Sequence, residues 1–364
     1  MRGELRARTV FLVLLPPIFF CSCAFSLTTV HAQADELSVA VSLPDFIPIV
    51  SDIGQEHVRI TGIMPPGTDP HGFTLTPAKI EEISSADIIV LANSNLLNYE
   101  RNIRENYPDK VYLDFLDYEK DGASLDDFPD YPRNSHGYWL KADNGIAIAK
   151  AFERKLAVRD SQHIEEYERN LNAFISRVEV AKSDLDTLSQ IHELRNKKVI
   201  AAVPGVNYII QNTKMRVGRV LLSEGSGFAS GQALLEIEQS LINGENLAIV
   251  CPESMREAKV GEISRQISQD TGAPVVYVRF LSSQNEESYI SQLYYNAAQF
   301  LSIGARSEIR SDQSLLFVIA IALISILALA EAYVIFRLRS RSWEMREMIE
   351  GPGKADEEQS SEKG

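Results

Sequence analysis

The fold of this chain is decided by residues 161–188, whose sequence is SQHIEEYERNLNAFISRVEVAKSDLDTL. Apolar side chains recur along this stretch at steps of three and four residues, namely Tyr167, Leu171, Phe174, Val178, Ala181, Leu185 and Leu188. This spacing places them on one face of an α-helix, and neither proline nor glycine interrupts the stretch. The sequence therefore predicts one long, continuous helix over residues 161–190.

Shorter elements on either side of this helix alternate between strand and helix patterns. Before it, the pattern predicts strands at 37–42, 58–64 and 87–91 and helices at 77–84 and 145–158. After it, the pattern predicts strands at 199–203, 247–251 and 275–278 and helices at 232–242, 256–270 and 287–300. Such alternation is typical of parallel sheets covered by helices.

We therefore expect an α/β protein of two lobes, each a parallel-rich sheet covered by helices, over residues 33–160 and 191–303. The long helix joins the lobes as a rigid linker that allows only small closing motions. A chain of 364 residues with 45% apolar and 24% charged content has the material for two such domains.

The N-terminal segment has the pattern of a secretory signal. Basic residues precede an apolar run at 10–20, and Val30-His31-Ala32 carries the small residues that a signal peptidase reads. We expect residues 1–32 to be removed on export. Ile18-Phe19-Phe20, directly before the first cysteine, matches a lipidation site poorly, so the sequence favours removal of the segment over lipid anchoring. Cys251 would then be the only cysteine left, which excludes an internal disulfide.

A second apolar run, residues 315–336, is long enough as a helix to cross a bilayer. A buried core helix is the alternative, but nothing resembling a domain follows the run. Basic residues come directly after it, and such residues stay on the cytoplasmic side: Arg337, Arg339 and Arg341. We expect a single-pass protein of the cell membrane, with its two lobes outside the cytoplasm, a short stem at 304–314 and a cytoplasmic tail at 337–364.

The charge and the absence of catalytic motifs narrow the function. A net charge of −14 argues against nucleic-acid binding, which needs a basic surface, and suits cations only in a general way. The sequence has no phosphate loop, nucleophile elbow or HExxH helix. We therefore expect a binding protein, not an enzyme, and a monomer.

The most informative loop is MPPGTDPHGF, residues 64–73, directly after the second predicted strand. Its prolines fix the chain at the carboxyl end of a sheet, where open α/β folds bind their ligands. His71 would thus be presented at a cleft by a rigid turn. A lone histidine is more often a surface or capping residue, so spacing alone leaves its role open.

This loop, the helix after Pro77, the Ser84-Ser85-Ala86-Asp87 entry to the next strand and the long linker helix together resemble the zinc/manganese ABC-transporter solute-binding family. The similarity covers most of residues 37–303. It implies an extracytoplasmic protein that captures zinc or manganese between two lobes and delivers it to an ABC permease and its ATPase. It also implies that His71 is a metal ligand.

The same resemblance implies a second ligand in SHGYWL, residues 135–140, where His136 precedes a Trp-Leu pair with one residue more between His and Trp than is usual. Two imidazoles suit zinc and other first-row ions, but such a site normally has four ligands. The second lobe departs from the family here. Val203-Pro204 stands where the family places His or Glu, and Arg279 stands at or beside its last carboxylate.

Glu253 follows a predicted strand of the second lobe and could donate to the metal, or it could pair with Arg279 or another base. Asp69 could orient His71, cap the helix or brace the turn. The acidic stretch 114–130 contains no histidine and is expected to be a solvated, mobile loop. The remaining histidines are expected at the surface: His57, His163 and His192.

Two other functions stay open from the sequence. In one, a rebuilt second lobe uses Arg279 to hold an anionic ligand or a metal chelate. In the other, the chain is an anchored adhesion or scaffold protein that keeps the fold without transport.

Overall fold

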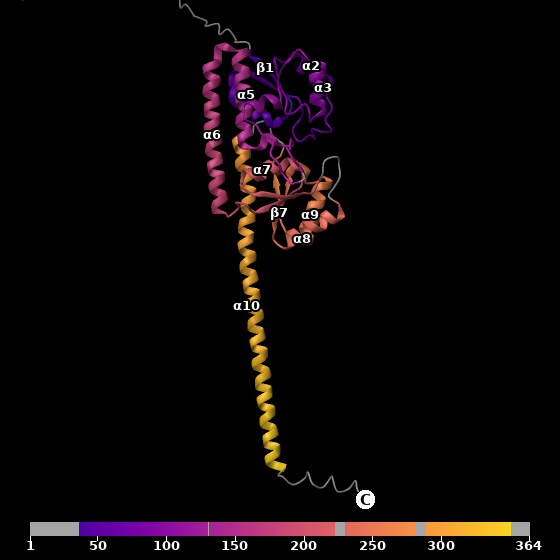
Figure 1. Cartoon of the computed structure of the whole chain (residues 1–364), viewed down its shortest axis with the longest axis vertical. Coiled ribbons are helices and arrows are strands. Elements are labelled where there is room, and N and C mark those ends of the chain that lie inside the picture. The colour runs from indigo at the N-terminus through magenta and orange to yellow at the C-terminus, as the bar shows by residue number, and fades with distance from the viewer. Residues whose placement is uncertain (1–35, 130, 223–229, 281–287, 351–364) are drawn as a thin grey trace, which may run out of the picture. The chain divides into compact units, whose positions relative to one another are not determined.

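A computed structural model describes residues 36–129, 131–222, 230–280 and 288–350 (Figure 1). The predicted signal segment and the end of the predicted tail lie outside this range. Two four-stranded sheets form the framework, and every paired strand in both sheets is parallel. The two-lobed α/β fold expected from the sequence is confirmed.

The first sheet has the strand order β2-β1-β3-β4. Its strands are β1 (Leu37–Val41), β2 (Val58–Gly62), β3 (Ile88–Val90) and β4 (Val111–Leu113). The helices of this lobe are α1 (Ile47–Gly54), α2 (Pro77–Ser85), α3 (Asn98–Asn106), α4 (Phe115–Lys120) and α5 (Ala142–Arg159). Strand β4 was not predicted: it has only three residues, of which two are half-buried, so it gives no clear alternating or apolar run.

The second sheet repeats this arrangement with the order β6-β5-β7-β8. Its strands are β5 (Lys198–Ala201), β6 (Arg216–Val220), β7 (Asn246–Pro252) and β8 (Val275–Val278). Its helices are α7 (Asn207–Asn212), α8 (Gly231–Ile242) and α9 (Lys259–Thr271). Short 3-10 turns punctuate both lobes: η1 (Pro44–Phe46), η2 (Gln55–His57), η3 (Tyr138–Leu140), η4 (Ser161–His163), η5 (Pro204–Val206) and η6 (Glu253–Met255).

The linker is helix α6, Ile164–Ile191, which runs unbroken alongside both lobes (Figure 1). It begins three residues later than the pattern predicted, because η4 forms a 3-10 turn first. The predicted apolar stripe is its buried face, with Tyr167, Phe174, Val178 and Ala181 fully buried. This face packs on α1, α5 and α10.

The acidic stretch 114–130 is not the solvated, mobile loop that the sequence suggested. Asp114 caps α4 in a reciprocal capping box with Asp117 and forms an ion pair with Arg104. Asp126 bonds to Lys141 at 2.7 Å. The carboxylates are engaged in local structure, so the described part of this stretch is packed onto the lobe.

The last helix, α10, runs from Tyr289 to Glu350 without a break. We expected three separate segments here: a helix at 287–300, a stem and a membrane helix. No proline occurs in the range, and one internal glycine costs a helix only about 1 kcal/mol. Within α10, Ile319–Leu338 has a mean hydropathy of 2.5 and no buried side chains, so by length and composition it can cross a membrane. A buried core helix is excluded for this window.

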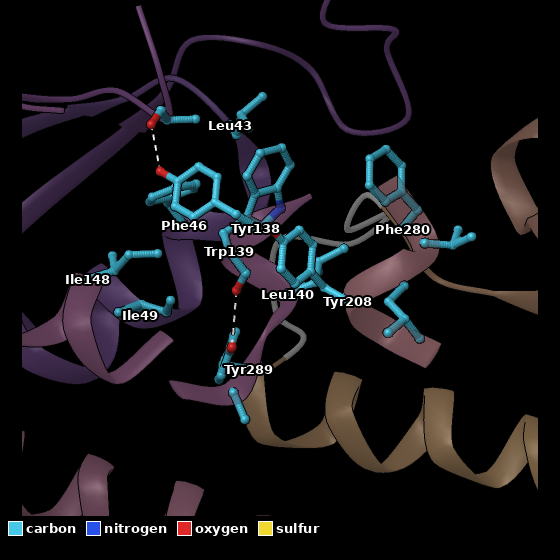
Figure 2. Close-up of a cluster of buried hydrophobic side chains, with 14 of the residues drawn as sticks. Leu43, Phe46, Ile49, Tyr138, Trp139, Leu140, Ile148, Tyr208, Phe280 and Tyr289 are labelled. Carbon is cyan, nitrogen blue, oxygen red and sulfur yellow. Dashed lines mark hydrogen bonds between the residues drawn. The ribbon is translucent and has the colours of Figure 1, made fainter. Parts of the chain in front are cut away.

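The two lobes meet at η3 and the start of α5 (Figure 2). Trp139 is buried between Phe46 of the first lobe and Phe280 of the second, with ring centroids 6.0 and 6.2 Å away. From α10, the hydroxyl of Tyr289 lies 3.0 Å from the carbonyl oxygen of Trp139 and 3.1 Å from that of Lys141, and donates its proton to this pair.

Removing the Tyr289 hydroxyl should destabilise this joint. Tyr289→Phe leaves the buried carbonyl of Trp139 without this donor, whereas the carbonyl of Lys141 still accepts the backbone N–H of Gly145 at 3.0 Å. We therefore expect the free energy of unfolding to fall by about 1–3 kcal/mol. Tyr294→Phe is the matched control, because Tyr294 lies on the same helix and bonds to the exposed Asp184. Urea denaturation of the full chain in detergent, followed by tryptophan fluorescence, measures both. Equal effects of the two substitutions would contradict a special role for the joint.

Candidate metal site

His71 is held by a turn that the sequence stiffens at several points. The loop leaves β2 through Pro65 and Pro66, and Gly67 takes a left-handed conformation with φ of 75°. The carboxylate of Asp69 then accepts the backbone N–H of His71 at 3.0 Å. Of the roles left open for Asp69, the structure shows the bracing of the turn.

His136 is oriented by Asn134, two residues earlier. One oxygen, Oδ1 of Asn134, accepts the backbone N–H of His136 at 3.0 Å and lies 3.2 Å from its Nδ1. An amide oxygen can only accept, so Nδ1 carries the proton and the lone pair of the ring is on Nε2. Asn134 is itself buried, and its Nδ2 donates to the carbonyl of Pro204 in the second lobe at 2.9 Å. Asn134 therefore couples the histidine to the second lobe.

Asn134 was not among the residues predicted at the site. The signal for it was the Asn-x-His spacing, since asparagine commonly bonds to the backbone two residues on.

The two histidines come together although 64 residues of chain separate them, with ring centroids 5.5 Å apart. Both line a cavity of about 750 Å³, together with Asp69. The cavity lies at the carboxyl ends of both sheets, where the fold places ligands.

The second lobe closes this cavity with apolar side chains. Its lining residues are Val203, Pro204, Gly205, Leu222, Met255 and Phe280, each of which follows a strand of the second sheet. Among the described residues, this wall offers no nitrogen or oxygen ligand from a side chain, and its one sulfur is the soft thioether of Met255.

Close backbone contact holds the two walls of the cavity together. Gly137, directly after His136, has φ of 70°, and a Cβ on it would lie 2.4 Å from the carbonyl oxygen of Gly205. Gly137 is one of the two residues that the sequence places between His136 and Trp139.

Comparisons with known proteins identify the family and the fold. Residues 39–302 match the protein family described as zinc-uptake complex component A, periplasmic, or ZnuA. The chain belongs to this family. Members of the ZnuA family are substrate-binding proteins of metal ABC transporters, and not enzymes.

Individual relatives are distant. The chain is 26% identical to the iron ABC transporter substrate-binding lipoprotein MtsA of Streptococcus pyogenes over 210 residues, which are 52% of this chain and 62% of that protein. The match thus spans less than two thirds of that relative. It is 22% identical to the manganese ABC transporter substrate-binding lipoprotein PsaA of Streptococcus mitis, over 80% of this chain and 95% of that one.

Solved structures show the same fold. A crystal structure of ZnuA superposes with a TM-score of 0.63 at 20% identity, covering 74% of this chain and 100% of that chain. The periplasmic zinc-binding protein TroA from Treponema pallidum gives 0.63 at 16% identity, covering 74% and 99%.

Glu253, the third residue expected at the metal, lies in a different arrangement. Its carboxylate accepts a hydrogen bond from the Tyr295 hydroxyl and lies 3.6 Å from Nε of Arg279. The guanidinium of Arg279 stacks on the Tyr295 ring at 3.6 Å. Neither Glu253 nor Arg279 lines the cavity. The pairing that the sequence left open as the alternative is present, and coordination by Glu253 would require these contacts to break.

Glu100 holds another loop of the first lobe that lines the cavity. Its carboxylate, fully buried, accepts the backbone N–H groups of Ala92 at 2.9 Å and Asn93 at 2.7 Å. These residues lead into Leu96 and Leu97, which line the cavity. Burial raises the pKa of Glu100 to about 7.

The raised pKa of Glu100 should make stability depend on pH. An acid with a raised pKa in the folded state stabilises below its unfolded value of 4.5, and this contribution is lost as pH rises towards about 7. We expect the free energy of unfolding of the wild type, measured relative to Glu100→Gln, to fall by up to about 3 kcal/mol between pH 5 and pH 8. Urea denaturation at several pH values tests this. A difference that is constant with pH would show that Glu100 does not titrate there.

Proposed function

We propose that this chain is an extracytoplasmic receptor that captures a divalent transition metal with His71 and His136. The observation that carries the proposal is the convergence of these two histidines, from separate loops, on one cavity between the lobes. Imidazole nitrogen suits zinc, copper, iron and nickel, whereas manganese prefers oxygen ligands. The donor set of the first lobe therefore favours zinc over manganese, with water completing the coordination and Asp69 supplying negative charge.

The rest of the transport role follows from family membership and α10. The receptor would deliver its metal to an ABC permease and ATPase, as a monomer. Helix α10 would anchor it in the cell membrane through Ile319–Leu338, with both lobes outside the cytoplasm.

A metal chelate is the second candidate ligand, because the second lobe supplies an apolar wall and the cavity volume of about 750 Å³ far exceeds that of a bare ion. An organic chelator could occupy that volume while the metal meets the two imidazoles. An anionic ligand held by Arg279 has less support, since Arg279 already pairs with Glu253 and stacks on Tyr295.

Removal of both histidines should abolish one metal site. We expect His71→Ala/His136→Ala to bind one equivalent of zinc less than the wild type, because a cation loses both imidazole ligands. Equilibrium dialysis of the metal-stripped full chain in detergent, at micromolar free zinc, measures the bound metal. His192→Ala, at the far end of α6, is the control and should bind as the wild type does. Equal zinc content in all three proteins would contradict the proposal.

Asn134 provides a finer test, because its two bonds can be separated. Asn134→Asp keeps an oxygen to accept from His136 but cannot donate to Pro204, whereas Asn134→Ala loses both. Loss of the group that orients a ligand typically weakens binding by about 10–100-fold. We expect that loss in Asn134→Ala and near-wild-type zinc affinity in Asn134→Asp, measured by titration against a chelating indicator. The same loss in both variants would mean that the Pro204 bond, and not the histidine tautomer, sets the affinity.

A further inference from the structure

A second group of histidines and carboxylates lies in the first lobe, away from the cavity. It comprises Glu56, His57, Asp160, His163 and Glu166, here called the outer histidine cluster. His57 directly precedes β2, and the loop carrying His71 follows the same strand. A strand of five residues spans roughly 13–17 Å, so the outer histidine cluster lies at the opposite edge of the sheet from the cavity.

Two histidines that the sequence placed singly at the surface form the centre of this cluster. The rings of His57 and His163 stack with centroids 3.8 Å apart and planes 20° apart. Tyr167 meets His57 edge-on, with centroids 5.7 Å apart. The His57 ring is thereby held between two neighbours, and its side chain is only 14% exposed.

Carboxylates fix the nitrogens of both rings. Nε2 of His57 lies 2.7 Å from Glu166, and Nδ1 of His163 lies 2.6 Å from Asp160. Asp160 also accepts the hydroxyl of Tyr167 at 2.7 Å. These hydrogen bonds and ring contacts hold the His57 ring in place. The side chain of Glu166 remains 42% exposed to solvent.

Glu56 completes a set of three possible metal ligands. One donor atom from each of Glu56, His57 and Glu166 lies within 4.8 Å of the others. Donors at 2.0–2.2 Å from a tetrahedral metal are about 3.3–3.6 Å apart, so small rotations of the exposed carboxylates would enclose an ion. One nitrogen and two carboxylates also balance the charge of a divalent ion and leave one position for water.

We propose that Glu56, His57 and Glu166 bind a divalent first-row transition metal at a second site, independent of the cavity. Glu56 and His57 belong to the turn between α1 and β2, whereas Glu166 belongs to the first turn of α6. A metal here clips the start of the linker helix to the first lobe. Imidazole in the ligand set favours zinc-like ions over calcium or magnesium.

The test uses the metal-stripped full chain in detergent with zinc as the probe, in the His71→Ala/His136→Ala background that removes the cavity site. We expect this background to retain one equivalent of zinc in equilibrium dialysis. Adding Glu56→Gln and Glu166→Gln should weaken the retained site by at least about tenfold, since an amide is a poor metal ligand. The amide oxygen that Glu166→Gln introduces can still accept a hydrogen bond from His57, so the local fold is preserved. The single Glu56→Gln variant, which alters only one exposed side chain, should also bind zinc more weakly than the background does.

The matched control carries Glu165→Gln and Glu168→Gln, which remove the same charge from exposed positions on the same helix. Its zinc binding should equal that of the background. If the background retains no zinc, or if the control and the Glu56/Glu166 variants bind equally, the second site is overturned while the cavity site stands. If the background binds as much zinc as the wild type, the proposed cavity site is wrong. The comparison of the Glu56/Glu166 variant with the Glu165/Glu168 control still tests the second site.

Discussion

The joint between the lobes is the constraint on which the rest of the structure depends. Residues 138–142 are bonded from both sides: Tyr138 donates to the carbonyl of Ala92 in the first lobe at 2.5 Å, and Asn212 of the second lobe donates to the carbonyl of Leu140 at 2.7 Å. Tyr208 adds a bond to the carbonyl of Asn134 at 2.6 Å. Because these are buried or half-buried polar contacts, sliding one lobe over the other would break bonds that water cannot easily replace. These bonds therefore fix the relative positions of the two walls of the cavity.

The two walls differ in chemistry. The first lobe contributes the two imidazoles and Asp69, whereas the described wall of the second lobe is apolar. A cation in this cavity would interact strongly with only one lobe, and a low-dielectric second wall would strengthen that interaction. The positive charge of Arg279, which the sequence placed near the metal, does not disturb this arrangement. Arg279 is turned onto Glu253 and the Tyr295 ring, so its guanidinium is compensated before any cation arrives.

Much of the fold could be predicted because its signals are local. The apolar stripe of α6 repeats along the whole helix, and the proline-rich loop before His71 follows a strand pattern directly. Strand β4 was missed because two of its three residues are only partly buried, whereas β3, of the same length, is fully buried and lies in an apolar run. The stem expected at 304–314 lies within the continuous helix α10, because polar sequence is compatible with a helix as well as with a loop.

The identity of some site residues could be predicted from the sequence, but their contacts could not. His71 and His136 could be proposed from their motifs, but their approach to 5.5 Å depends on how two loops pack. The stacking of His57 on His163 depends on α6 crossing beside the α1–β2 turn, and single positions in the sequence carry no trace of it. Only Asn134 left a local signal that could have been used.

Helix α10 links the joint to the membrane-competent segment. Tyr289 at its start donates to the carbonyls of Trp139 and Lys141, and Ile319–Leu338 lies further along the same helix. A flexible stem would separate the movements of the lobes from those of an anchor, whereas an uninterrupted helix has no loop in which rotation can be absorbed. The orientation of α10 at the joint is therefore continuous with its orientation in any bilayer that it crosses. If Ile319–Leu338 crosses a bilayer, α10 would connect the first lobe to it through the joint, through α6 and through the bond from Gln292 to Asp45 at 3.3 Å.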